Sequence, residues 1–174
     1  MKTKYLPFIA LILLSFGCKN NSQKSESNSI QIDANTENKM DQNSLIAFGV
    51  EYANAWSNQK PEKVANFFAS DASLQVNDGD PAVGTEAITN VAKGFMDAFP
   101  DMIVSMDSLV TKSNKTRFYW TLTGTNSVPG GTGNKVKISG FEEWTLSEEG
   151  LVQVSKGHFN AEEYNRQLNG DTAE

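Results

Sequence analysis

Residues 117–125 read RFYWTLTGT, and this stretch decides the class of fold. Polar residues (Arg, Tyr and three Thr) alternate in it with Phe, Trp, Leu and Gly, so successive side chains leave the chain on opposite sides. That period of two is typical of a long β-strand with two distinct faces. The same period predicts further strands on both sides of this one, at residues 102–110, 135–146 and 151–159. The second half of the chain is therefore predicted to form a meander of antiparallel strands.

Before Pro100 the apolar residues recur with the period of a helix instead. Further helices are expected over residues 85–99 and 162–168, and Ser44 or Asn43 is the expected N-cap of the first helix. The apolar stripe of that first helix comprises Leu45, Phe48, Gly49, Tyr52, Ala53 and Trp56. Helices followed by a run of strands predict an α+β domain, whose sheet curls around the long helix and leaves a pocket between them.

The first 17 residues predict an export signal. Lys2 and Lys4 precede an apolar run, Tyr5–Phe16, that is too short to span a bilayer. Gly17 then precedes Cys18, the only cysteine of the chain, and this ending resembles a lipobox, where bacterial lipoprotein signal peptidase cuts before a diacylated cysteine. The alternative is an ordinary cleaved signal that leaves a free thiol. The expected location is the cell envelope, with the chain lipid-anchored to a membrane on the periplasmic or outer-membrane side.

Residues 18–43 are predicted to be the lipidated cysteine and a disordered tether. Asn, Ser, Gln, Lys and Glu dominate this segment, and such a composition cannot bury enough apolar surface to offset chain entropy. Residues 44–168 are long enough for one domain with one core. Residues 169–174 are expected to be a disordered tail.

The charge of the chain argues against nucleic-acid binding. The sequence holds 15 basic and 21 acidic residues, and removal of residues 1–17 takes away two lysines and no acid, which leaves 13 against 21 and a net charge of −8. Phosphate contacts need a basic face, so no nucleic-acid partner is predicted. One histidine and one cysteine cannot build the usual metal sites, and the glycine loop at residues 130–133 joins strands rather than opening a helix. Neither a metal nor a cofactor is predicted.

Four stretches of the chain, in order, resemble the SnoaL-like polyketide cyclase branch of the nuclear transport factor 2-like superfamily. They read FPDMIVSMDSLV, RFYWTLTGT, GNKVKISGFEEW and GHFNAEEYNRQL. With the helix that precedes Phe99 they cover nearly the whole folded domain. The resemblance implies a cone-shaped α+β domain in which a curved antiparallel sheet wraps an apolar cavity. It also implies a homodimer packed sheet to sheet as a frequent assembly.

The resemblance places the family's catalytic aspartate at a residue that is not acidic in this chain. In the cyclases, an aspartate of the last strand, within a segment like HWDELGLLRQL, is the acid/base for an intramolecular aldol closure. The matching segment begins His158-Phe159-Asn160, so the aspartate position holds Asn160. An amide cannot exchange a proton as a carboxylate does, so that role is lost. The resemblance predicts that Asn160 projects into the cavity and hydrogen-bonds to a ligand carbonyl.

Two other residues are candidates for proton transfer. His158, the only histidine, is two residues from Asn160, so both side chains are expected on one face of the strand. The alternative is a histidine at the strand end with a structural hydrogen bond. Glu142 shares a mostly apolar strand face, so it is expected to be partly buried with a raised pKa. Its alternative is an ion pair with Arg117 or Lys137.

Aromatic residues are the expected lining of the pocket, although each also suits an ordinary core. The candidates for ligand binding, beside Asn160, are Tyr52, Trp56, Phe68, Phe99, Trp120 and Trp144. We therefore expect a membrane-anchored lipoprotein whose domain binds a small apolar or carbonyl-bearing molecule without converting it. The alternative is an ester cyclase or isomerase-type enzyme that uses His158 or Glu142. A third hypothesis is a structural or partner-binding role through the open sheet.

Overall fold

The structure is a computed structural model that describes residues 40–170. The predicted export signal at residues 1–17, Cys18 and most of the tether lie outside the described residues, as do residues 171–174. The expectations for those segments stay predictions. Within residues 40–170 no helix is long and apolar enough to cross a membrane.

The order of the elements confirms the α+β class. The helices are α1 (Gln42–Ser57), α2 (Pro61–Ala65), α3 (Thr85–Ala98) and α4 (Ala161–Asn169). The strands are β1 (Phe68–Val76), β2 (Ala82–Val83), β3 (Ile103–Lys112), β4 (Lys115–Thr125), β5 (Lys135–Leu146) and β6 (Val152–Phe159). The change of hydrophobic period at Pro100 thus coincides with the change from α3 to the long strands.

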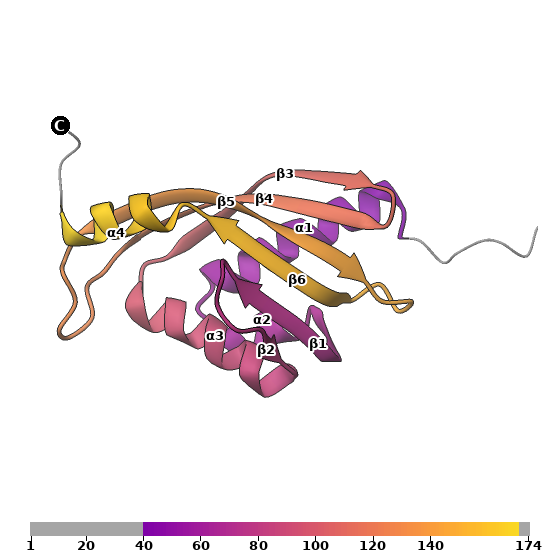
Figure 1. Cartoon of the computed structure of the whole chain (residues 1–174), viewed down its shortest axis with the longest axis horizontal. Coiled ribbons are helices and arrows are strands. Elements are labelled where there is room, and N and C mark those ends of the chain that lie inside the picture. Colours follow the sequence, from indigo (N-terminus) through magenta and orange to yellow (C-terminus); the bar gives the residue numbers. More distant parts are fainter. Residues whose placement is uncertain (1–39, 171–174) are drawn as a thin grey trace, which may run out of the picture. The chain divides into compact units, whose positions relative to one another are not determined.

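These strands form one sheet in the order β2-β1-β6-β5-β4-β3 (Figure 1). The strands β3 to β6 are an antiparallel meander, whereas β1 pairs with β6 in parallel. In the long β4–β5 pair, Trp120 lies opposite Gly140. A Cβ at Gly140 would lie 2.4 Å from the carbonyl oxygen of His158 and 2.7 Å from the Trp120 ring. Glycine is therefore required for the indole to lie against β5 at this point.

The first helix begins two or three residues earlier than expected, because its N-cap is Asp41 rather than Asn43 or Ser44. The Asp41 carboxylate accepts hydrogen bonds from the backbone N–H groups of Asn43, at 2.9 Å, and Ser44, at 3.1 Å. At the other boundary, α3 ends at Ala98, and Phe99 and Pro100 follow it. Proline has no N–H with which to continue the helix, so this end agrees with the sequence.

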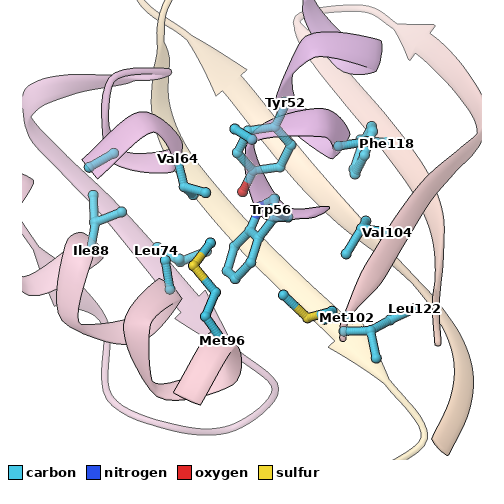
Figure 2. Close-up of a cluster of buried hydrophobic side chains, with 14 of the residues drawn as sticks. Tyr52, Trp56, Val64, Leu74, Ile88, Met96, Met102, Val104, Phe118 and Leu122 are labelled. Carbon is cyan, nitrogen blue, oxygen red and sulfur yellow. The ribbon is translucent and has the colours of Figure 1, made fainter. Parts of the chain in front are cut away.

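The core lies between the helices and one face of the sheet. Figure 2 shows Tyr52 and Trp56 of α1 among the buried side chains, together with Met96 of α3 and residues of β3 and β4. The helix α1 packs against β3, and α3 packs against α2 and β1. We call the covered side of β4–β6 the inner face; it carries Phe118, Leu122, Ile138, Glu142, Trp144 and Gly157. The opposite side is the outer face; it carries Tyr119, Thr121, Ser139, Phe141, Glu143 and His158.

Candidate functional site

An apolar cavity of about 60 Å³ lies between the inner face and the helices. Its walls come from α1, α3 and five strands, and they comprise Trp56, Leu74, Val76, Phe95, Val104, Phe118, Trp120, Leu122, Ile138, Glu142, Gly157 and Phe159. Among these described residues, Glu142 is the only one with an ionisable side chain. The cavity therefore combines aromatic and aliphatic walls with a single acidic group.

The alternation of β5 places Glu142 on the inner face. In the sheet it lies between Phe118 of β4 and Gly157 of β6. Only 7% of its surface is exposed. A carboxyl group at such a depth needs hydrogen-bond partners, because burial without them is strongly unfavourable.

Three donors from different parts of the fold meet the Glu142 carboxyl group. Its Oε2 accepts from Ser155 Oγ at 2.6 Å, from Trp144 Nε1 at 2.9 Å and from the Tyr52 hydroxyl at 3.1 Å. Its Oε1 accepts only from that same Tyr52 hydroxyl, at 3.2 Å. One oxygen is thus occupied by the protein, while the other keeps spare hydrogen-bonding capacity.

Burial raises the pKa of Glu142, and the hydrogen bonds from Ser155, Trp144 and Tyr52 oppose that effect. Burial, and then the nearby Glu142, also raise the pKa of Tyr52 well above its ordinary value. The expectation of a buried Glu142 with a raised pKa is confirmed. The alternative ion pair with Arg117 is wrong, because Arg117 is bound to Glu143 on the outer face, at 3.1 Å.

The aromatic candidates divide into three groups. Trp56 and Trp120 line the cavity. Tyr52 and Trp144 do not line it, but both donate hydrogen bonds to the acid that does. Phe68 and Phe99 are 4% and 0% exposed and belong to the ordinary core.

Trp120 has a further feature that distinguishes it from a core residue. Its indole Nε1 is buried and has no hydrogen-bond partner among the residues that the structure describes. Buried N–H groups are nearly always paired, and leaving one unpaired costs about 1–3 kcal/mol. An unpaired donor beside the cavity is therefore better suited to a ligand site than to a core that only stabilises the fold.

Ser155 is a site residue that sequence reasoning missed. It is fully buried in β6 and makes the shortest hydrogen bond to Glu142. A hydroxyl at an inward position of a strand that neighbours GFEEW is the signal that identifies it. The sequence analysis also did not identify Phe118 and Gly157, which flank Glu142 in the neighbouring strands. Their positions beside Glu142 depend on strand register, which the sequence does not show.

The structure places His158 outside the cavity. Its neighbours in β6, Gly157 and Phe159, both line the cavity, so His158 points to the outer face. There it is exposed, and its ring lies 4.9 Å from that of Phe141, between centroids. His158 and Glu142 therefore do not share a cavity.

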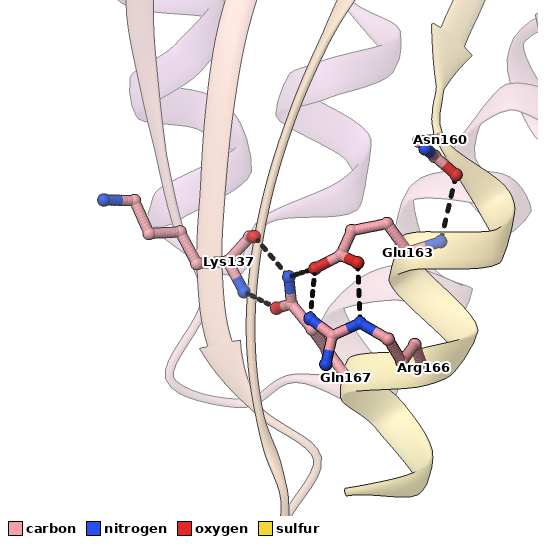
Figure 3. Close-up of polar contacts among 5 residues, drawn as sticks. All are labelled: Lys137, Asn160, Glu163, Arg166 and Gln167. Carbon is pink, nitrogen blue, oxygen red and sulfur yellow. Dashed lines mark hydrogen bonds and ion pairs between the residues drawn. The ribbon is translucent and has the colours of Figure 1, made fainter. Parts of the chain in front are cut away.

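The expected position of Asn160 is also wrong, because β6 ends at Phe159 and Asn160 is the N-cap of α4. Its exposed side chain accepts a hydrogen bond from the backbone N–H of Glu163 at 2.9 Å (Figure 3). The side chain therefore does not enter the cavity. The role of the family's aspartate cannot be transferred to this position, so an amide at residue 160 does not exclude catalysis in the cavity.

Polar contacts hold α4 against the start of β5 (Figure 3). The Gln167 side chain accepts from the backbone N–H of Lys137 at 2.6 Å and donates to its carbonyl at 3.0 Å. Hydrogen bonds from Arg166 and Gln167 lower the pKa of Glu163 to about 2. Asn160 thus belongs to a structural cap.

No group of three or more His, Cys, Asp or Glu within residues 40–170 is placed to hold a metal ion.

Comparison with known proteins identifies the family and the fold of this chain. The sequence model of the SnoaL-like polyketide cyclase family matches residues 50–168. No curated protein sequence matches the chain.

Solved structures show the same fold at low identity. A hypothetical protein with a ketosteroid isomerase-like fold from Catenulispora acidiphila, in complex with trimethylamine, has a TM-score of 0.61 and 13% identity, over 73% of this chain and 97% of that one. A putative SnoaL-like polyketide cyclase from a Jannaschia species has a TM-score of 0.61 and 13% identity, over 77% and 100%. The epoxide hydrolase/cyclase-like enzyme SalBIII, of pyran ring formation in salinomycin, has a TM-score of 0.62 and 15% identity, over 71% and 95%. At these identities the likeness shows the fold alone.

Proposed function

This chain belongs to the SnoaL-like polyketide cyclase family. From this premise we propose that its domain binds a small, largely apolar, carbonyl-bearing molecule against Glu142. The observation that carries the proposal is a single buried acid in an otherwise apolar and aromatic cavity. Ligand sites typically combine apolar walls with a few well-placed polar groups. The family and its structural neighbours support a small-molecule site.

The protonation state of Glu142 explains why a carbonyl group fits. Burial raises its pKa and so favours the neutral carboxyl group. The proton belongs on Oε1, because Oε2 already accepts from Ser155, Trp144 and Tyr52. A neutral Glu142 therefore offers an O–H donor from Oε1, and a carbonyl oxygen is its natural acceptor.

The pH dependence of binding tests this proposal. The probe is butanone, and its binding is followed through the indole N–H signals of Trp120 and Trp144 in NMR spectra. Affinity is expected to fall as the pH rises through the pKa of Glu142, since the ionised carboxylate can no longer donate. The dependence should vanish in Glu142→Gln and persist in the matched control Glu143→Gln. Unmoved indole signals, or a pH dependence that survives in Glu142→Gln, would contradict the proposal.

A second candidate function is proton transfer by Glu142 in a cyclase or isomerase-type reaction. A buried carboxyl group with a raised pKa, held by three donors, has the properties of a general acid or base. Deuterium exchange at the carbon next to the butanone carbonyl, in heavy water, separates the two candidates. An enzyme accelerates this exchange in the wild type but not in Glu142→Gln, whereas a binding protein accelerates it in neither.

We also propose that lipid on Cys18 tethers this domain to a membrane of the cell envelope. The support is the sequence alone: an apolar export segment, then Gly17 and the only cysteine. Mass spectrometry of the chain from its native membrane should find an acylated N-terminal Cys18, and Cys18→Ser should release the domain. A mature chain that retains Met1 contradicts this proposal.

The homodimer stays a prediction from the family resemblance. The outer face offers a row of aromatic rings from three neighbouring strands, Tyr119, Phe141 and His158, in register across the sheet. Sedimentation equilibrium of the wild type and of Phe141→Glu tests whether this row lies in a dimer interface.

A further inference from the structure

We infer that the groove between α3 and the turn at residues 77–81 is the outer half of the ligand site. The groove holds the polar tail of an elongated ligand, and this tail donates hydrogen bonds. The apolar, carbonyl-bearing head of the same ligand occupies the cavity at Glu142. This inference rests on the proposed function and adds the shape and the tail chemistry of the ligand. Figure 1 shows α3 beside β1 and β2, and the groove runs along this side of the domain.

The size of the cavity is the first argument. Pockets that enclose a whole drug-sized ligand measure about 300–1,000 Å³. The Glu142 cavity measures about 60 Å³ and can enclose only one end of such a molecule. The groove beside it is open and measures about 420 Å³. A ligand larger than the cavity therefore has room in this direction.

The cavity and the groove are separated by a wall of three side chains. Leu74, Val76 and Phe95 line both spaces. Leu74 and Val76 belong to β1, inside the sheet, where their positions are set by strand pairing. Phe95 lies in the last turn of α3, is only partly buried, and meets Trp56 edge-on at 6.1 Å between ring centroids. Rotation of the Phe95 side chain is thus the movement that joins the two spaces.

The polar groups of the groove select the tail. Asp80 of the turn, Asn90 of α3 and Tyr164 of α4 all line the groove. Both Asp80 and Asn90 are exposed. A carboxylate only accepts hydrogen bonds, so Asp80 favours a hydroxyl or amine and repels an acidic tail.

The helix α3 carries a glycine where it lines the groove. Gly94 lines the groove, and a Cβ placed on it would meet no atom within 4 Å. Glycine in a helix interior is less stable than alanine, and the surroundings offer no steric reason for it. The missing side chain leaves room for a ligand, and the position accepts a bulky residue without disturbing the fold.

Binding of methyl ketones of different length to the full chain tests the inference. The probes are butanone, a long-chain methyl ketone with a terminal hydroxyl, and the same chain with a terminal carboxylate. The hydroxyl-tailed ketone should bind at least about tenfold more tightly than butanone, equivalent to 1.4 kcal/mol. The carboxylate-tailed ketone should bind several-fold more weakly than its hydroxyl counterpart, and Asp80→Asn should remove that difference.

Blocking the groove gives the matched comparison. Gly94→Trp should weaken binding of the hydroxyl-tailed ketone about tenfold and leave butanone unchanged, while Gly94→Ala leaves both unchanged. If Gly94→Trp has no effect, or if long and short ketones bind equally, the inference is wrong and the proposed function stands. If no ketone moves the indole signals of Trp120 and Trp144, the proposed function fails and the inference fails with it.

Discussion

Glu142 and Glu143 are neighbours in β5, yet they occupy opposite environments. Glu142 points to the inner face, where it is buried and bound by Tyr52, Trp144 and Ser155. Glu143 points to the outer face, where it pairs with two cations. The same residue type is thus a candidate site residue at position 142 and a surface ion-pair partner at position 143.

The two carboxyl groups differ in pKa for identifiable reasons. Burial raises the pKa of Glu142. The hydrogen bond from Arg117 lowers the pKa of Glu143; burial opposes that effect, and the nearby Lys115 lowers the pKa further. Strand alternation sends the two side chains to opposite faces, and the helices that cover only one of those faces create the difference. Removing each carboxylate in turn therefore tests how much burial on the covered face changes the contribution of a carboxylate to the free energy of unfolding.

The largest effect is expected for replacing each acid by leucine. Glu142→Leu leaves the donors of Tyr52, Trp144 and Ser155 buried without an acceptor, which should lower the free energy of unfolding by about 3–5 kcal/mol. Glu143→Leu should lower it by less than about 1 kcal/mol, because exposed ion pairs contribute little. Urea denaturation measures both. Equal losses in the two variants would show that the inner face is no more dependent on its acid than the outer face.

The next largest effect concerns pH. The folded-state pKa of Glu142 lies above its ordinary value of 4.5. The folded protein therefore holds the proton longer than the unfolded chain, and stability falls as the pH rises from 4.5 through the folded-state pKa, by at most about 1.4 kcal/mol per pH unit. In Glu142→Gln, this decrease of stability with rising pH should be absent. Glu143→Gln should instead lose a contribution of opposite sign, present above pH 4.5 and lost as the pH falls through the lowered pKa of Glu143. Urea denaturation at a series of pH values measures the slopes, and a wild-type slope that Glu142→Gln preserves contradicts the assignment.

A smaller effect is expected for a single hydroxyl on each face. Ser155→Ala removes the 2.6 Å hydrogen bond to Glu142 and should destabilise the fold by about 1–3 kcal/mol. It should also raise the pKa of Glu142 further, as NMR titration of that carboxyl group would report. The matched control is Ser139→Ala on the outer face, where the hydroxyl is exposed and bonds to Thr121 at 2.8 Å. Its expected loss is below about 0.5 kcal/mol, and a larger loss than for Ser155→Ala would reverse the comparison.

The smallest effect is expected on the outer face alone. Arg117→Ala removes the ion pair with Glu143 and the contact of the guanidinium with the Phe141 ring, at 5.1 Å from its centroid. The loss of stability should be smaller than for Ser155→Ala and should shrink in about 1 M salt, which screens exposed charges. The pKa of Glu143 should rise towards its ordinary value. A loss that salt does not change would mean that packing on Phe141, not charge, is the main contribution.

Much of the fold could be predicted from hydrophobic period alone. The alternation in RFYWTLTGT identified the long strand β4, the change of period at Pro100 located the end of α3, and GFEEW indicated that one of its two glutamates is buried. The sequence could not show which residues meet Glu142. Tyr52 lies 90 positions away along the chain, and only the packing of α1 on the sheet brings its hydroxyl to the carboxyl group.

The last strand shows why alternation has limits. Val152 and Ser155, three residues apart, are both buried, because the pairing of β5 with β6 shifts register between Thr145 and Leu146. A bulge of this kind reverses which side chains face inward beyond it. His158 is consequently outside and Gly157 and Phe159 are inside.

By itself the sequence predicted α1, α3, α4, the four long strands and the burial of one acid, since these follow from local period and residue type, while the family followed from the resemblance of four stretches. The tertiary structure alone decided which donors surround Glu142 and that His158 is solvent-exposed. The physical reason is that strand register, bulges and helix docking depend on contacts between distant parts of the chain, which no local pattern of residues encodes.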